Sequence, residues 1–105
     1  MIIRIVKLAF LTENCCQFER LFYERRQEIL AFPGCIDVQL LKDTKVENVF
    51  FTMSHWESED ALEKYRQSEL FLATWSQIKP WFSESAKAWS LKSTSTEIRH
   101  DSSEK

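Results

Sequence analysis

The stretch Asn-Val-Phe-Phe-Thr-Met-Ser-His-Trp at residues 48–56 limits the possible folds more than any other part of the chain. It is dense in aromatic and other β-favouring residues and predicts a strand. Alternate residues of a strand point to opposite faces of the sheet, and here both sets include large apolar side chains. A sheet with one face in water alternates apolar and polar residues more cleanly. Both faces of this sheet therefore need a cover.

Two further strands and a helix are predicted before this stretch. Residues 2–10 are rich in Ile, Val and Phe and predict the first strand. Asn14, with Gln17 three residues later, predicts a helix that begins with a capping box. An apolar stripe follows until the Pro-Gly pair at 33–34 ends the helix. Residues 35–42 then alternate as a second strand.

A second helical region and a last strand are predicted after residue 56. Ser58 is placed to cap a helix whose first turn carries acidic side chains, which the helix dipole favours. This helix is expected to break near Gln67 and Ser68, to restart, and to stop at Pro80 because proline removes a backbone donor. Residues 86–92 alternate as a fourth strand.

The order strand, helix, strand, strand, helix, strand predicts an α+β domain with the ferredoxin-like βαββαβ fold. We expect it to span residues 1–92, with a four-stranded antiparallel sheet and both helices on one face. The simplest cover for the other face is the sheet of a second copy, which predicts a homodimer. Residues 93–105 are rich in Ser, Thr and charged residues and are expected to form a flexible tail.

Composition excludes several classes of partner. The net charge is −2 with acidic and basic residues interspersed, so there is no surface of a single sign for nucleic acid or an anionic membrane. No apolar run approaches the roughly 20 residues that span a bilayer, and the first ten residues lack a signal-peptide cleavage site. We expect a cytoplasmic protein with neither nucleic acid nor membrane as a partner.

The cysteines Cys15, Cys16 and Cys35 predict neither a disulfide framework nor a metal site. Their number is odd, and adjacent cysteines have poor geometry for pairing with each other or for holding one metal ion. The sequence also lacks the ligand spacings of zinc sites. We therefore expect reduced, mostly buried thiols and no bound metal.

The residues around Trp56 carry a family likeness. The strand that ends there is followed by Glu-Ser-Glu-Asp-Ala-Leu-Glu-Lys-Tyr and then by Ser-Glu-Leu-Phe, and Phe-Pro-Gly at 32–34 precedes the second strand. With these motifs the chain resembles the antibiotic biosynthesis monooxygenase superfamily over about residues 1–92. The resemblance implies a dimeric α+β barrel with a pocket between sheet and helices in each subunit. Several relatives oxidise aromatic or quinol substrates there with molecular oxygen and no metal or flavin, so no cofactor is expected.

Polar groups of the relatives' pockets are mostly replaced in this chain. Against the haem-degrading branch, the resemblance places Trp75 at the iron-ligating histidine, Tyr65 at a tryptophan and Val6 at an asparagine. Haem turnover by that mechanism is not expected, because an indole nitrogen is only a hydrogen-bond donor and does not ligate iron. Another pattern has a glutamate and a histidine where this chain has Ser54 and Tyr65.

Six residues are candidates for lining the expected pocket. The resemblance places Tyr65 and Trp75 on the inner helix faces, where they would orient an aromatic ligand or else form ordinary core. Strand alternation puts Arg4 on the helix-facing side, where it would stabilise an oxyanion on an enolate-like substrate or else reach solvent near the strand end. The full set is Tyr65, Trp75, Phe71, Ser54, Thr52 and Arg4. No catalytic residue is assigned.

His55 is the histidine that precedes the tail, and its ordinary pKa would suit a general base. It shares a strand face with Met53, however, which turns it toward the expected dimer side. A structural role is therefore expected for it.

Two functions stay open at this point. The first is a small cofactor-free monooxygenase that binds a phenol, quinol or anthrone-like compound in a dry aromatic pocket and lets the substrate carbanion reduce oxygen. The second is a non-catalytic dimeric module that binds a small ligand or a partner on the same scaffold. One fold hosts both functions, so the fold does not choose between them.

Overall fold

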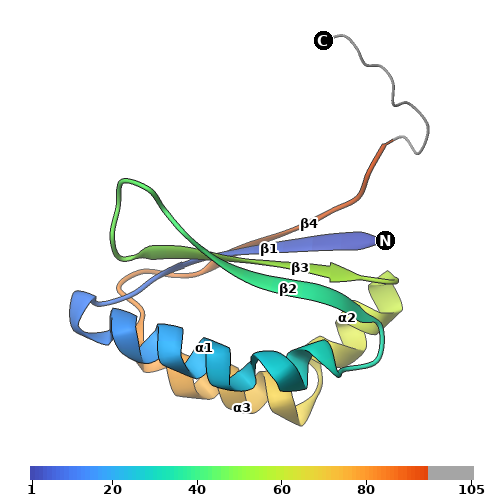
Figure 1. Cartoon of the computed structure of the whole chain (residues 1–105), viewed down its shortest axis with the longest axis horizontal. Coiled ribbons are helices and arrows are strands. Elements are labelled where there is room, and N and C mark those ends of the chain that lie inside the picture. Colours follow the sequence, from blue (N-terminus) through green and yellow to red (C-terminus); the bar gives the residue numbers. More distant parts are fainter. Residues whose placement is uncertain (95–105) are drawn as a thin grey trace, which may run out of the picture.

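The computed structural model describes residues 1–94 of the chain, so almost all of the tail predicted over 93–105 lies outside the described residues. Within them, a four-stranded sheet forms one layer and the helices form a second layer against one face of it (Figure 1). The strand order is β2-β3-β1-β4, and every neighbouring pair is antiparallel. The predicted ferredoxin-like arrangement is confirmed, as an open sheet in the single chain.

The elements follow one another in the predicted order. They are β1 (Ile2–Ala9), η1 (Thr12–Asn14), α1 (Cys15–Leu30), β2 (Cys35–Lys42), β3 (Val49–Trp56), α2 (Glu59–Arg66), α3 (Glu69–Ile78), η2 (Lys79–Trp81) and β4 (Lys87–Leu91). The ends of the strands differ from the predicted ends by at most one residue. Such differences are expected because element ends fray.

The start of α1 differs from the prediction. The short 3-10 turn η1 precedes the helix, and Asn14 makes no side-chain hydrogen bond to the helix backbone. Its amide donates to the side chain of Gln17 instead. The predicted capping box is therefore wrong, because the two side chains bond each other rather than the backbone. At α2 the predicted cap is confirmed, since Ser58 Oγ accepts from the N–H of Ala61 at 3.1 Å.

Ser68 separates α2 from α3, where the break was predicted. Its hydroxyl donates to the backbone carbonyl of Tyr65 at 2.6 Å and accepts from the backbone N–H of Phe71 at 3.1 Å. One side chain thus bonds the last turn of α2 and caps the N-terminus of α3.

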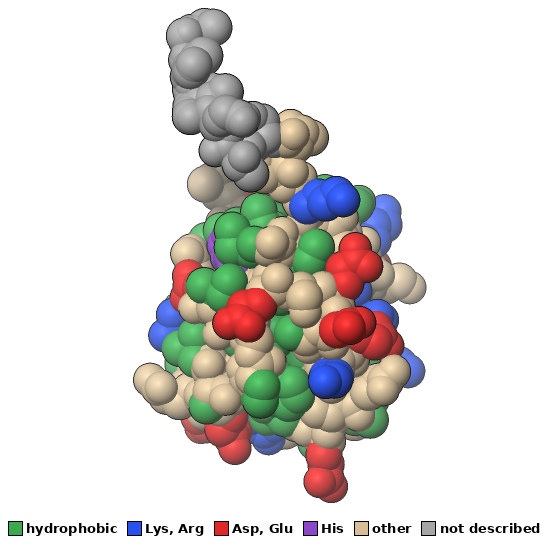
Figure 2. Space-filling view, turned by 90° about the vertical axis from the view of Figure 1, so that its right-hand side faces the viewer, with side chains coloured by type: hydrophobic (Ala, Val, Ile, Leu, Met, Phe, Trp, Pro, Cys, Tyr) green, Lys and Arg blue, Asp and Glu red, His purple; other side chains and the backbone are tan. Residues whose placement is uncertain are grey.

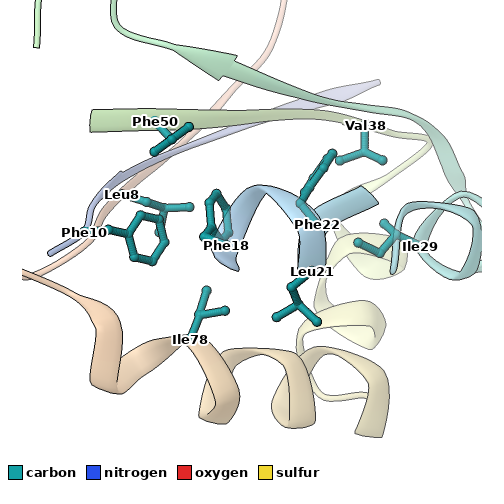
Figure 3. Close-up of a cluster of buried hydrophobic side chains, with 9 residues drawn as sticks. All are labelled: Leu8, Phe10, Phe18, Leu21, Phe22, Ile29, Val38, Phe50 and Ile78. Atoms are coloured by element: carbon teal, nitrogen blue, oxygen red, sulfur yellow. The ribbon is translucent and has the colours of Figure 1, made fainter. Parts of the chain in front are cut away.

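A large apolar core lies between α1, α3 and the sheet (Figure 3). Phe10 stacks on Phe18 with ring centroids 4.3 Å apart and meets Phe50 edge-on at 5.9 Å. These aromatic contacts fix α1 against the central strands. The buried members of this core are Leu8, Phe10, Phe18, Leu21, Phe22, Ile29, Val38, Phe50 and Ile78.

A smaller core surrounds Trp56 at the opposite end of the sheet. Its buried members are Ile2, Trp56 and Leu62. Trp56 is 0% exposed, and its Nε1 donates to Ser54 Oγ at 2.9 Å. Its ring stacks on that of Tyr65 with centroids 4.8 Å apart. The smaller core therefore ties α2 to the end of β3.

The thiols are less buried than expected. Cys16 is exposed, Cys15 and Cys35 are partly exposed, and all three are free. Cys16 is two residues from the buried Phe18, which places it about 200° around the helix from the core side. The expectation of mostly buried thiols is therefore wrong.

The surface carries both signs of charge. Figure 2 shows the end of the molecule where α2 and the N-terminus lie, and acidic and basic side chains are interspersed there among apolar ones. None of the helices within residues 1–94 is both long and apolar enough to cross a membrane.

Gly34 links α1 to β2 in a backbone conformation that other residues rarely adopt. Its φ is 90°, and its carbonyl accepts from the N–H of Glu57 at 2.9 Å. A Cβ at this position would lie 2.4 Å from the Cβ of Ala61 on α2. A glycine is therefore needed here both for the turn and for the close approach of α2.

We expect Gly34→Ala to lower the free energy of unfolding by about 2–5 kcal/mol. The left-handed backbone costs a residue with a Cβ about 1–2 kcal/mol, and the clash with Ala61 adds about 1–3 kcal/mol. A second change, Ala61→Gly, should relieve the clash but not the backbone strain. Urea unfolding of both single variants and the double variant measures the two parts, and a Gly34→Ala protein as stable as the wild type would contradict this explanation.

Candidate functional site

A partly open cavity of about 350 Å³ lies between the sheet and the helices. The three helices α1, α2 and α3 form one side, and the strands, chiefly β1 and β3, form the other. Most of the lining side chains are aliphatic or aromatic, and a few are polar. The size and the lining are typical of a site for a small molecule.

The cavity brings together all of the predicted pocket residues, which are Tyr65, Trp75, Phe71, Ser54, Thr52 and Arg4. On the sheet side, Arg4 lies opposite Ser54, and Thr52 lies opposite Val6 two residues along. These residues face the helices because alternate strand residues share a face. The structure thus places the six residues around one cavity, and their part in ligand binding stays a prediction.

Tyr65, Phe71 and Trp75 form a continuous set of rings, here called the aromatic wall. Tyr65 meets Phe71 edge-on with centroids 5.2 Å apart, and Phe71 stacks on Trp75 at 5.7 Å with an interplanar angle of 11°. All three are partly exposed, whereas Trp56 behind Tyr65 is fully enclosed. The aromatic wall therefore lines the cavity, and its members Tyr65 and Trp75 also pack against the core.

The hydroxyl of Tyr65 is a polar tip on the aromatic wall. Burial, with a smaller contribution from Cys35, raises the pKa of Tyr65 well above its ordinary value of about 10. Within residues 1–94 no other group forms a hydrogen bond with this hydroxyl. It therefore stays protonated at neutral pH, where it donates a hydrogen bond and does not act as a base.

Ser54 serves the fold as well as the cavity. It is buried, and its oxygen already accepts the hydrogen bond from the indole of Trp56. A serine hydroxyl carries one donor in addition to its acceptor positions. Ser54 therefore still has its O–H to offer to a ligand.

Arg4 lines the cavity and is also partly exposed, so both of its predicted alternatives stay open. The strand register places it within β1, between Ser54 on β3 and Ser90 on β4. Its Nη1 donates to Ser90 Oγ at 2.9 Å. Burial and the nearby Arg66 lower the pKa of Arg4, while Glu63 acts in the opposite direction.

Three polar residues of the cavity lining, Arg66, Thr74 and Lys87, were missed in the sequence. Arg66 follows Tyr65 and pairs with Glu63 at 3.2 Å. Thr74 precedes Trp75, and its Oγ1 accepts from Nη1 of Arg25 at 2.7 Å. Arg66 and Thr74 each stand next to a predicted residue. A basic side chain in the last turn of a helix is equally typical of a solvated surface, so the sequence alone does not assign Arg66 to the cavity.

Among the described residues, no aspartate, glutamate, histidine or cysteine lines the cavity. His55 pairs with Ile3 and Asp37 on the other sheet face, as predicted, and its Nδ1 is buried without a hydrogen-bond partner there. Residues 1–94 also contain no group of three or more His, Cys, Asp or Glu side chains placed to hold a metal ion. The cavity can therefore stack and hydrogen-bond a ligand, but its side chains offer no general base.

Comparison with known families agrees with this geometry. The model of the antibiotic biosynthesis monooxygenase family matches residues 1–76. The chain belongs to this family. The matched part runs from β1 to most of α3 and includes the aromatic wall.

Individual relatives give a more limited likeness. A haem oxygenase (mycobilin-producing) of Mycobacterium tuberculosis is 33% identical over 49 residues, which is 47% of this chain and 47% of that protein. The match thus spans about half the length of this curated relative.

Solved structures share the fold over most of the chain. SnoaB from Streptomyces nogalater, a cofactor-independent oxygenase solved as a single-site mutant, superposes with a TM-score of 0.79 and 15% identity over 90% of this chain and 94% of that one. A conserved protein from Methanosarcina mazei Go1 superposes with a TM-score of 0.81 and 19% identity, over 88% of this chain and 92% of that one. At such identities the likeness concerns the fold alone.

If Trp75 borders a cavity, Trp75→Ala should cost clearly less stability than Trp56→Ala. Removing the enclosed Trp56 should cost about 3–5 kcal/mol, because the fold closes only partly around the space left behind. Trp75 is partly exposed and loses fewer contacts. Denaturant midpoints followed by circular dichroism compare the two variants, and equal losses would mean that this span is ordinary core.

The raised pKa of Tyr65 predicts a loss of stability at high pH. The unfolded chain releases this proton near pH 10 and the folded chain only above it, so stability falls as pH rises beyond 10, by up to about 1.4 kcal/mol per pH unit. Tyr65→Phe should make the fall between pH 10 and 11 shallower. Tyr23→Phe is the matched control, since Tyr23 is 60% exposed. Parallel curves for Tyr65→Phe and the wild type would contradict the burial of an ionisable hydroxyl.

Proposed function

We propose that this protein is a cofactor-independent monooxygenase that oxidises a small planar phenol, quinol or anthrone-like compound in the cavity. The observation that carries the proposal is the aromatic wall facing a space of about 350 Å³ that also contains Arg4 and the Tyr65 hydroxyl. Both polar groups are donors at neutral pH. A flat ring system would stack on the aromatic wall, and an oxygen at its edge would accept hydrogen bonds from Arg4 and Tyr65.

In this proposal the substrate supplies the electrons. An anthrone-type substrate that has lost a proton from carbon adds oxygen at that carbon, and the resulting hydroperoxide loses water to leave a carbonyl. One oxygen atom enters the product and the other leaves as water, so no further reductant is consumed. The protein stacks the ring, excludes water and stabilises the oxyanion through Arg4 and Tyr65.

The lack of a general base limits the substrates that fit this proposal. No side chain of the described lining accepts a proton at neutral pH. The substrate must therefore ionise readily, helped by the positive charge of Arg4. Anthrones and electron-rich quinols meet this condition better than simple phenols.

The cavity residues do not fit turnover of haem, the activity named for the mycobacterial relative. Trp75 stands where the resemblance places the iron-ligating histidine, and the lining contains no imidazole or thiolate. Tyr65 is held protonated by burial and so is a poor iron ligand. No step of the proposed reaction involves haem.

A role limited to binding is the second candidate, and the missing general base is the observation that favours it. A cavity of stacking rings and donors binds an aromatic ligand whether or not oxygen then reacts. Turnover separates the two candidates.

The direct test is oxygen uptake with anthrone and a naphthohydroquinone, without added metal or reductant. The wild type should consume oxygen well above the spontaneous rate, and Tyr65→Phe should lower kcat by about tenfold, because one donor to the oxyanion is lost. Tyr23→Phe is the control and should behave like the wild type. Binding of these compounds without faster oxygen uptake would favour the binding-only role, and neither binding nor uptake would overturn the proposal.

We also propose that the working unit is a homodimer formed by the sheet faces that carry no helices. On that face Ile5 of β1 lies between Met53 of β3 and Trp89 of β4. Trp89 and Leu91 of β4 remain 44% and 47% exposed in the single chain. A second sheet would bury this apolar surface, and a stable dimer of this kind is expected to be largely apolar.

Light scattering at micromolar concentration should therefore give twice the mass of one chain. Ile5→Glu should give the mass of one chain while keeping the circular dichroism of the fold, because it places a charge at the centre of the contact. Tyr23→Glu, on the exposed side of α1, should remain a dimer. A wild type with the mass of one chain would refute this arrangement.

A further inference from the structure

The guanidinium of Arg4 has more hydrogen-bond donors than the proposed reaction uses. It lies on the helix-facing side of the sheet, flanked by Ser54 and Ser90. Both neighbours are neutral, and of its five N–H groups only one on Nη1 has an acceptor, the hydroxyl of Ser90. Within residues 1–94 the ion pairs are Arg26–Asp37 and Arg66–Glu63, so Arg4 has no carboxylate partner.

The surroundings of Arg4 add to this imbalance of charge. Arg66 also lines the cavity, and its partner Glu63 lies outside the lining and is more than half exposed. Arg4, Arg66 and Glu63 together carry a net charge of +1. Lys87 also borders the cavity, but it lies opposite Lys7, and strand alternation directs its side chain to the other sheet face, so its charge does not add to this excess.

Partial burial of Arg4 makes this excess of positive charge unfavourable. Burial, then the charge of Arg66, lowers the pKa of Arg4, which means that its cation is destabilised where it stands. An arginine keeps its charge in proteins, and Glu63 offsets only part of this cost, so a bound anion would relieve it further. A partly desolvated guanidinium with free donors is a typical binding group for a carboxylate.

We propose that the ligand of this cavity is an aromatic carboxylic acid, with its ring against the aromatic wall and its carboxylate on the guanidinium of Arg4. This inference rests on the proposed function and narrows it, because it adds an acid group to the phenol, quinol or anthrone-like ring system. With Arg4 bound to the carboxylate, the Tyr65 hydroxyl is the donor that remains for the oxyanion. The aromatic wall accounts for the ring, and Arg4 accounts for the charge.

A carboxylate suits this place better than a phenolate. It is ionised at neutral pH without help, whereas a simple phenol has a pKa near 10, like tyrosine, and the lining has no base to ionise it. Its two oxygens match the fork of the guanidinium. An inorganic anion would satisfy Arg4 but would leave the aromatic wall without a contact.

The test is calorimetric binding of 2-naphthoate, 2-naphthamide and 2-naphthol, three ligands of similar size that differ in the group at one position. The wild type should bind naphthoate about tenfold or more tightly than the other two, as expected for a hydrogen-bonded charge pair. Arg4→Gln should remove this preference while its affinity for naphthamide changes little. Arg4→Lys should keep part of the preference, because it retains the charge without the fork.

Arg20→Gln is the matched control, since Arg20 is an exposed residue of α1 outside this cavity, and it should behave like the wild type. Circular dichroism confirms that each variant is folded.

Each other outcome rules out a specific part of the inference. Equal binding of naphthoate and naphthamide by the wild type would overturn the acid preference while leaving an aromatic pocket in place. A preference that survives Arg4→Gln would overturn the role of Arg4. Competition by sulfate as strong as that by naphthoate would reduce the site to a general anion site and overturn the aromatic acid. No binding of any of the three ligands would count against the aromatic pocket itself, and oxygen uptake with anthrone tests that pocket separately.

Discussion

The enclosed indole of Trp56 is the contact on which the arrangement of the cavity depends. It is 0% exposed, its nitrogen is bound to Ser54, and its ring stacks on Tyr65 and meets Phe32 edge-on at 6.4 Å. These contacts join the end of β3 to α2 and to the turn that leads into β2. Tyr65 is held between this indole, Phe32 and Phe71, and it also lines the cavity. The turn at Gly34 allows the required close approach of α2.

The sequence was informative wherever a pattern had a single structural meaning. Alternation along residues 48–56 correctly placed Thr52 and Ser54 toward the helices, because strand neighbours must face opposite sides. Arg66 was not predicted, because a basic residue ending a helix is also what solvent exposure produces. Asn14 does not cap the helix because its side chain donates to the side chain of Gln17 and its backbone N–H donates to Leu11, and propensity does not report such bonds. Packing decided the position of Arg66, whereas local hydrogen bonds decided that of Asn14.

The family match concerns the fold of this chain, and the chemistry of the cavity depends on its own lining residues. The matched residues include the turns, caps and core that make the fold, whereas the described lining of the cavity contains no aspartate, glutamate, histidine or cysteine. What remains is a site of rings and hydrogen-bond donors. In such a site the reactivity of the ligand, more than that of any side chain, decides what takes place.

The interruption at Ser68 affects how the aromatic rings of α2 and α3 are arranged around the cavity. In an unbroken helix, Tyr65 and Trp75 would be ten residues apart and would point about 80° away from each other around the axis. Because the chain restarts as a second helix after Ser68, the rings of α2 and α3 can border the same space. The hydroxyl of Ser68, which bonds the backbone of both helices, thus holds the junction between them, and the shape of the cavity depends on that junction.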